Sequence, residues 1–194
     1  MPLRLKFPVV LASASPRRQE LLRTLVADFQ VVAADLDEDQ FHSDDPWQTA
    51  QILAREKAML VFDSHPECLV IGGDTVVALP SGDGFTQLAK PSDAAHAKAM
   101  LRQLSDQTHS VITGIALRWP KGLHLFADRS EVTFRGLSDA EIDAYVATGQ
   151  PMDKAGAYGL QDSSHSFIAK VEGSVNNVIG LPTEMLEEAL KQIG

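Results

Sequence analysis

The segment CLVIGGDTVVAL at 68–79 constrains the fold more than any other stretch of the chain. It is almost wholly apolar, which predicts a long buried strand interrupted by two glycines. Helical patterns lie on both sides of it, at 46–63 and from Ser92 to about 105. Strands that alternate with helices are typical of an α/β architecture, here with a largely mixed sheet.

The rest of the chain continues this alternation. A hairpin turn is expected at PSGDG, and a long loop at 150–164. Further strands are expected at 8–13, 29–35, 85–91, 109–119, 121–135 and 165–173, and further helices at 16–26, 138–149 and 182–194. The sequence contains neither internal repeats nor low-complexity segments. Its length of 194 residues therefore predicts a single domain over 1–194.

Charge and composition exclude several functional classes. The net charge of −9 argues against broad, nonspecific nucleic-acid binding, which needs a basic surface. No apolar run reaches the length of a membrane span, and the N-terminal apolar residues fit a first strand better than a signal peptide. A single cysteine, Cys68, suits a reducing compartment. We therefore expect a cytoplasmic protein with no stable nucleic-acid or membrane partner.

The segment SASPRR at 13–18 is a candidate phosphate site. Ser15 and the proline after it fit the start of a helix, whose free N–H groups attract anions, and Ser13 adds a hydroxyl. Arg17 and Arg18 occupy the first helical turn, where the helix dipole disfavours cations. A polyphosphate gripped by both guanidinium groups would explain them. The alternative is two ordinary surface arginines.

Lys57 is a second candidate. The predicted helix at 46–63 carries an apolar face formed by Ala50, Leu53, Ala54, Leu60 and Val61. Lys57 falls at the centre of this face, where its ammonium group must either extend out of the core to solvent or meet a partner charge in a cleft. The spacing alone leaves both interpretations open, and solvent-directed lysines are the commoner case.

Asp74 and a neighbouring acidic segment could serve metal or proton chemistry. Asp74 follows two glycines in the long apolar strand, and such glycines let a ligand or another backbone come close. An aspartate there can bind Mg²⁺ or accept a proton from water. The segment DLDED at 35–39 could add oxygen ligands. The alternatives are a turn aspartate and a solvated acidic surface.

The long loop at 150–164 carries Lys154, Tyr158 and Gln161. Loops of this length in compact domains are often functional. The amide of Gln161 offers both donors and an acceptor, and could therefore read the edge of a nucleobase. An ordinary connecting loop is the alternative.

Taken together, these segments resemble the Maf family of nucleotide pyrophosphatases. The matching stretches are SASPRR at 13–18, DLDED at 35–39, AREKA at 54–58, IGGDTVV at 71–77, LAKP at 88–91, DKAGAYGLQ at 153–161 and GLP at 180–182. They occur in the family's order and span most of the chain. The resemblance implies a Maf-like, inosine triphosphatase-like fold: a mixed sheet flanked by helices, with a cleft between two lobes.

The resemblance also implies an activity and roles for residues. It implies hydrolysis of a nucleoside triphosphate to the monophosphate and pyrophosphate, with Mg²⁺ or Mn²⁺ as the cofactor. Asp74 takes the place of the general base, with Glu38 as the cleft glutamate, and these two carboxylates would hold the metal. The phosphate-binding positions of the family fall on Arg17, Arg18, Lys57 and Lys90.

The specificity positions of the family fall on Arg17, Thr75 and Gln161. Thr75 and the loop AGAYGLQ resemble the branch that acts on dTTP and UTP rather than the branch that acts on 7-methyl-GTP. The expected partners are a nucleoside triphosphate and, for self-assembly, a second copy of the chain in a homodimer. Two rival functions stay open: a non-catalytic nucleotide-binding regulator of septum formation and cell division, and a house-cleaning pyrophosphatase for damaged purine nucleotides.

Overall fold

The structure, a computed structural model, describes residues 2–193. Seven strands form one mixed sheet in the order β2-β1-β3-β5-β6-β7, with β4 paired to β3. The strands are β1 (Val9–Ala12), β2 (Gln30–Val31), β3 (Leu69–Ser81), β4 (Gly84–Leu88), β5 (Thr108–Trp119), β6 (Gly122–Phe134) and β7 (Ile168–Glu172). Strand β1 runs parallel to β2 and β3, whereas the other pairs are antiparallel. The expected α/β architecture with a mixed sheet is confirmed.

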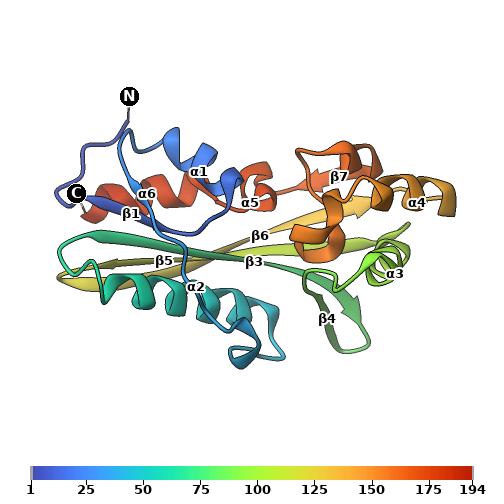
Figure 1. Ribbon diagram of the computed structural model, residues 1–194, viewed down its shortest axis with the longest axis horizontal. Helices are drawn as coiled ribbons and strands as arrows, with labels where there is room; N and C mark the ends of the chain where they lie inside the picture. The colour runs from blue at the N-terminus through green and yellow to red at the C-terminus, as the bar shows by residue number, and fades with distance from the viewer. Residues whose placement is uncertain (1, 194) are drawn as a thin grey trace.

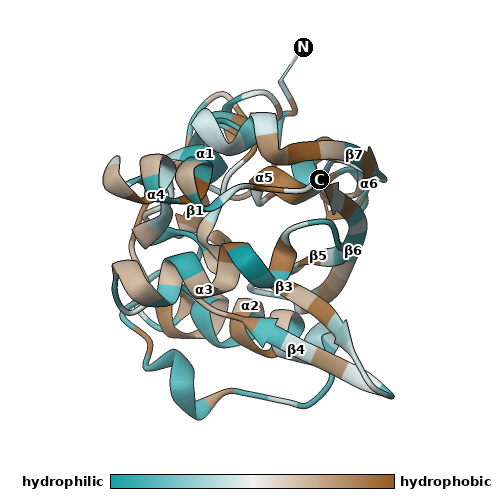
Figure 2. Ribbon diagram, turned by 90° about the vertical axis from the view of Figure 1, so that its right-hand side faces the viewer, coloured by the Kyte–Doolittle hydropathy of each residue, from teal (hydrophilic) through white to brown (hydrophobic). Residues whose placement is uncertain are grey.

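Helices cover both faces of this sheet. They are α1 (Pro16–Arg23), α2 (Pro46–Phe62), α3 (Ala94–Leu104), α4 (Asp139–Ala147), α5 (Val175–Ile179) and α6 (Thr183–Ile193). Figure 1 shows α2 on one face and α1, α5 and α6 on the other. The view along the sheet in Figure 2 shows the same layers, with α2 and α3 below and α1 and α5 above. No helix within residues 2–193 has both the length and the hydropathy that a membrane span requires.

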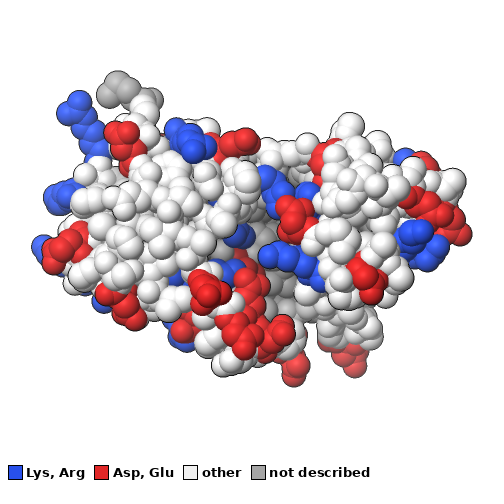
Figure 3. Space-filling view, in the orientation of Figure 1, with Lys and Arg blue, Asp and Glu red and all other residues white. Residues whose placement is uncertain are grey.

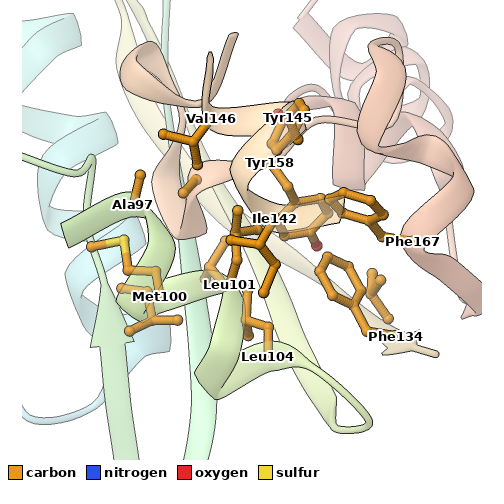
Figure 4. Close-up of a cluster of buried hydrophobic side chains, with 14 of the residues drawn as sticks. Ala97, Met100, Leu101, Leu104, Phe134, Ile142, Tyr145, Val146, Tyr158 and Phe167 are labelled. Atoms are coloured by element: carbon orange, nitrogen blue, oxygen red, sulfur yellow. The ribbon is translucent and has the colours of Figure 1, made fainter. Parts of the chain in front are cut away.

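The two largest clusters of buried hydrophobic residues lie at opposite ends of the sheet. One packs α1 and α6 against β1, β3 and β5, and includes Leu22, Ile71 and Leu186. The other, shown in Figure 4, joins α3 and α4 to β6 and to the segment after α4. Its aromatic rings meet edge to face, with centroids of Phe134 and Tyr158 4.8 Å apart. Each core belongs to one lobe of the molecule.

Helix α2 lies unusually close to the sheet because two strand positions are glycine. A Cβ atom at Gly72 of β3 would come within 2.2 Å of the Ala54 carbonyl oxygen, and one at Gly114 of β5 within 2.3 Å of the Ala50 carbonyl oxygen. No other residue could occupy these positions without moving the helix. The sequence left open whether a ligand or another backbone approaches the Gly-Gly pair, and the structure places the backbone of α2 against Gly72.

One edge of β3 is interrupted. Residues 69–72 pair with β1 and residues 77–81 pair with β4 on the same side of the strand, while β5 pairs along the other side. In the described chain, residues 73–76 therefore have a partner strand on one side only. Asp74 lies in this gap, between the two lobes.

Several predicted boundaries differ from the structure. The strand expected at 29–35 pairs only at Gln30–Val31, because its neighbour β1 ends at Ala12. Asp93 rather than Ser92 caps α3, since its carboxylate accepts from the backbone N–H of His96 at 2.7 Å. The expected loop at 150–164 contains 3₁₀ turns at Gln150–Asp153 and Ala155–Ala157 and the start of a third at Ser163–Phe167, so the following strand begins only at Ile168. Helix α5 was not expected, and the last residue of the helix predicted at 182–194 lies outside the described range.

Candidate active site

A cavity of about 370 Å³ opens between the two lobes, at the interrupted edge of β3. Figure 3 shows the hollow, with basic and acidic side chains around its rim. The expected cleft is confirmed. Of the predicted site residues, Ser13 is not part of the cavity lining. The others line the cavity: Arg17, Arg18, Glu38, Lys57, Asp74, Thr75, Lys90 and Gln161.

Lys57 and two carboxylates form the charged centre of this cavity. The ammonium nitrogen of Lys57 lies 2.6 Å from Asp74 Oδ1 and 2.7 Å from Glu38 Oε1. The side chains of Lys57 and Asp74 are about nine-tenths buried, whereas that of Glu38 is 44% exposed. Of the two interpretations of Lys57, the structure supports a partner charge in a cleft, not extension to solvent. The close approach of α2 to β3 brings the ammonium and carboxylate groups together.

The two arginines of α1 have different partners. Arg18 donates from Nε to the Gly180 carbonyl at 2.8 Å, from Nη1 to Ser13 Oγ at 3.2 Å and from Nη2 to Thr75 Oγ1 at 3.0 Å. Arg17 instead lies 3.5 Å from the exposed carboxylate of Asp153. Arg18 is therefore held rigidly at the cavity wall. Arg17 has the looser contact and is the arginine more free to meet an anion.

Thr75 belongs to a buried hydrogen-bond chain that the sequence did not indicate. Its hydroxyl lies 3.0 Å from that of Thr113, directly opposite on β5, and Thr113 donates to the Asn177 carbonyl at 2.9 Å. Thr113 and Asn177 are fully buried. The sequence offers only a weak signal for them: a hydroxyl residue in an apolar strand, and an asparagine soon after Ser174, which caps α5.

The segment that carries Gln161 is anchored by its neighbours. Asp162 accepts hydrogen bonds from the hydroxyl groups of Tyr145 and Ser164, and the Lys154 ammonium lies 3.4 Å from the same carboxylate. Lys154, Tyr158 and Gln161 line the cavity, as expected if this loop is functional. Gln161 itself is exposed, and its amide is therefore accessible to a ligand.

Comparison with known proteins identifies the family of this chain. The family model described as "Maf-like protein" matches residues 8–193. The chain belongs to the Maf family. It is 46% identical over 188 residues to the dTTP/UTP pyrophosphatase of Myxococcus xanthus (strain DK1622), covering 96% of this chain and 92% of the relative. It is 42% identical over 186 residues to the protein of the same name from Geobacillus sp. (strain WCH70), covering 96% and 98%.

A solved structure supports the fold of this Maf family member. The Ham1 protein of Staphylococcus aureus superposes with a TM-score of 0.56 at 17% sequence identity, covering 96% of this chain and all of that one. At this identity the match concerns the fold alone. The expected fold, a mixed sheet flanked by helices with a cleft between two lobes, is thereby confirmed.

The two carboxylates of the Maf site differ in acidity. Burial raises the pKa of Asp74 above its usual value, although the nearby charges of Lys57 and Arg18 oppose this shift. Burial also acts to raise the pKa of Glu38, but the hydrogen bond and charge of Lys57 outweigh it and lower that pKa. Asp74 is therefore the stronger base of the pair.

The oxygen donors of the site fit a hard divalent cation that is held jointly by protein carboxylates and by the phosphates of a substrate. Within residues 2–193, no three His, Cys, Asp or Glu side chains are grouped as an all-protein metal site. Glu38 and Asp74 nonetheless converge on the Lys57 ammonium. Mg²⁺ is commonly held by one or two carboxylates together with substrate phosphates. These residues suit such a site and not a permanently bound structural metal.

Proposed function

We propose that the chain hydrolyses dTTP and UTP to the nucleoside monophosphate and pyrophosphate. The observation that carries this proposal is the buried Lys57–Asp74 pair at the edge of a cavity lined by basic side chains, in a chain whose relatives are named dTTP/UTP pyrophosphatases. A nucleoside monophosphate and a pyrophosphate are the two halves produced when the α–β anhydride bond breaks.

In the proposed reaction, Asp74 is the general base. Its Oδ1 accepts from Lys57, which leaves Oδ2 to take a proton from water. The water oxygen bonds to the α-phosphorus, the bond from that phosphorus to the bridging oxygen breaks, and its electron pair leaves with pyrophosphate. The raised pKa of Asp74 makes it a better proton acceptor than an ordinary aspartate once it is ionised.

The basic residues would bind the triphosphate and stabilise its charge. Lys57 and Lys90 line the charged part of the cavity, and Arg17 stands at the capped N-terminus of α1, where free N–H groups also favour anions. Arg18 and Ser13 would hold this end of the helix against β3. Catalysis would come from positioning and electrostatic stabilisation of the transferring phosphorus.

A divalent cation, Mg²⁺ or Mn²⁺, would be held by Glu38 and Asp74 together with phosphate oxygens. When bound, it would neutralise charge on the phosphates. We place the reaction in the cytoplasm, where nucleoside triphosphates are made and used. The lone cysteine of the sequence is unpaired in the structure, which is consistent with that compartment.

We assign pyrimidine selectivity to Thr75 and Gln161, with Arg17 at the third specificity position. Of the two arginines, however, Arg18 is the one bonded to Thr75, so Arg17 would act on the base only indirectly. An amide can pair with the O4 and N3–H edge of uracil or thymine, which differ only by a methyl group. We expect little discrimination between dTTP and UTP, and roughly tenfold to hundredfold discrimination against mismatched bases.

An assay of the purified protein tests this proposal against both rivals. Turnover of dTTP, UTP, CTP, GTP and 7-methyl-GTP is compared with Mg²⁺, with Mn²⁺ and after chelation, and the products are separated. The proposal expects monophosphate and pyrophosphate from dTTP and UTP in the presence of metal. Binding without turnover would favour the non-catalytic regulator. A preference for purine nucleotides would favour the house-cleaning pyrophosphatase that acts on purine nucleotides. Release of orthophosphate would show cleavage of a different bond.

A further inference from the structure

A directed chain of hydrogen bonds runs from Arg18 to the interior of the protein. Arg18 Nη2 lies 3.0 Å from Thr75 Oγ1, which lies 3.0 Å from Thr113 Oγ1, which lies 2.9 Å from the Asn177 carbonyl oxygen. Thr113 is fully buried and does not line the cavity. Its hydroxyl reaches the cavity through Thr75, whose hydroxyl lies 3.0 Å away.

The direction of this chain follows from what each group can donate. A carbonyl oxygen only accepts, so Thr113 gives its single hydroxyl hydrogen to Asn177. The Asn177 carbonyl needs this hydrogen bond from Thr113. Its usual helical partner would be the backbone N–H of Leu181, four residues on, but that N–H donates to the Asn176 carbonyl instead. Thr75 must therefore donate to Thr113, and it accepts from Arg18, which can only donate. After these two hydrogen bonds, the Thr75 hydroxyl oxygen has one lone pair left, so it can only accept a further hydrogen bond.

Thr75 lies on the side of the cavity that suits a base. Successive side chains of a strand point to opposite faces, so Thr75 faces away from the Asp74–Lys57 pair. Val77 shares this face of β3 with Thr75, and the apolar side chains of Tyr158, Val178 and Ile179 and the amide of Gln161 line the same cavity. Apolar walls with a few placed polar groups are typical of sites for planar ligands.

We propose that Thr113 sets the hydrogen-bond polarity of Thr75, so that Thr75 accepts from the N3–H of uracil or thymine and rejects the N3 lone pair of cytosine. This proposal rests on the proposed function and extends it to a buried positioning residue. In the same ring placement, cytosine would set its N3 lone pair against the lone pair of Thr75, and Thr75 could not turn its hydrogen outward without breaking its bond to Thr113.

The test is the ratio of kcat/KM for UTP to that for CTP, two substrates with the same sugar. Thr113→Val keeps the side-chain shape but removes the acceptor, which frees the hydroxyl hydrogen of Thr75 to turn toward a ligand. Thr113→Ser keeps the hydroxyl. Ser130→Ala is the matched control, because Ser130 is a buried hydroxyl that contacts Asn177 Nδ2 and the Ser174 carbonyl but lies outside the chain that reaches Thr75. Thermal unfolding of each variant shows which of them are folded.

The proposal expects Thr113→Val to lower the UTP/CTP ratio about tenfold, partly through an absolute rise in kcat/KM for CTP. Thr113→Ser and Ser130→Ala should keep the wild-type ratio. A folded Thr113→Val with the wild-type ratio, or an equal loss of selectivity in Ser130→Ala, would overturn the proposal while the pyrophosphatase function stands. A wild-type protein that does not prefer UTP to CTP would overturn both this proposal and the selectivity assigned to Thr75 and Gln161, and the pyrophosphatase function would still stand. If Thr113→Val does not fold, Thr113→Ser and Thr113→Ala decide: equal ratios in those two variants would overturn the proposal, and a lower ratio in Thr113→Ala alone would support it.

Discussion

The ammonium nitrogen of Lys57 lies 2.6 Å from Asp74 Oδ1, across the tight contact between helix α2 and strand β3. The same nitrogen lies 2.7 Å from Glu38 Oε1, so one cation bridges a buried carboxylate and an exposed one. A buried ion pair of this kind is weak evidence for stability, because desolvation offsets much of the attraction between the charges. The position of this ion pair at the edge of the cavity is better explained by a role in a reaction of a bound anion.

Asp74→Asn should lower kcat by about 10²–10⁴-fold and leave the protein folded. Asparagine keeps the shape of the side chain but cannot take a proton from water. The measurement is kcat for UTP together with the free energy of unfolding by urea. Wild-type turnover in a folded variant would remove Asp74 from the mechanism.

Lys57→Met should lower kcat/KM for UTP at least about 100-fold. Methionine fills the apolar face of α2, but the buried Asp74 carboxylate loses its partner charge, so the free energy of unfolding should also fall by about 3–5 kcal/mol. Lys98→Met is the matched control, since Lys98 makes an ion pair of 2.7 Å with Asp143 away from the cavity. If Lys57→Met is fully active and more stable than wild type, the lysine has no part in catalysis.

Gly72→Ala should destabilise the protein by about 1–3 kcal/mol or more and also reduce activity. The new Cβ would meet the Ala54 carbonyl at 2.2 Å, so α2 would have to move and carry Lys57 away from Asp74. Gly84→Ala is the control on the same hairpin: its Cβ would meet no atom within 4 Å, and we expect a change of about 0.4–1 kcal/mol toward greater stability. Equal stability of both variants would show that α2 adapts without cost.

Stability should fall as pH drops from about 6.5 to about 4, through His109. Burial lowers the pKa of His109 from 6.5 to about 4, and its Nε2 lies 2.7 Å from the Tyr158 hydroxyl. Between these two pH values the unfolded chain binds a proton at this histidine and the folded chain does not. Acid therefore favours unfolding, by a total on the order of 3 kcal/mol. Urea unfolding of wild type and His109→Gln at pH 7 and pH 4.5 measures this, and equal pH dependence in both would contradict it.

The sequence predicted the architecture well where elements are long. The apolar run at 68–79 and the helical face at 46–63 appear as β3 and α2, because burial of a long apolar stretch leaves few alternatives. Short elements were the difficult ones. Helix α5, only five residues at Val175–Ile179, has too few residues to show a helical period.

The site was predictable as a set of residues but not as a set of contacts. Periodicity placed Lys57 on the apolar face of α2 without revealing that this face meets Asp74, because the helix–strand pairing depends on Gly72 and Gly114 in two different strands. Likewise SASPRR indicated two equivalent arginines, whereas only Arg18 reaches Gly180 and Thr75, which are distant in sequence. Such long-range contacts follow from the assembled sheet and leave no local pattern in the chain.

Hydrolysis of UTP in water enriched in ¹⁸O tests the central claim most directly. The products are separated and the label in each is measured by mass spectrometry. Attack at the α-phosphorus predicts one ¹⁸O atom in UMP and none in pyrophosphate, with the signal lost in Asp74→Asn. Label in pyrophosphate or in orthophosphate, or the absence of turnover by the metal-supplemented wild type, would contradict the account.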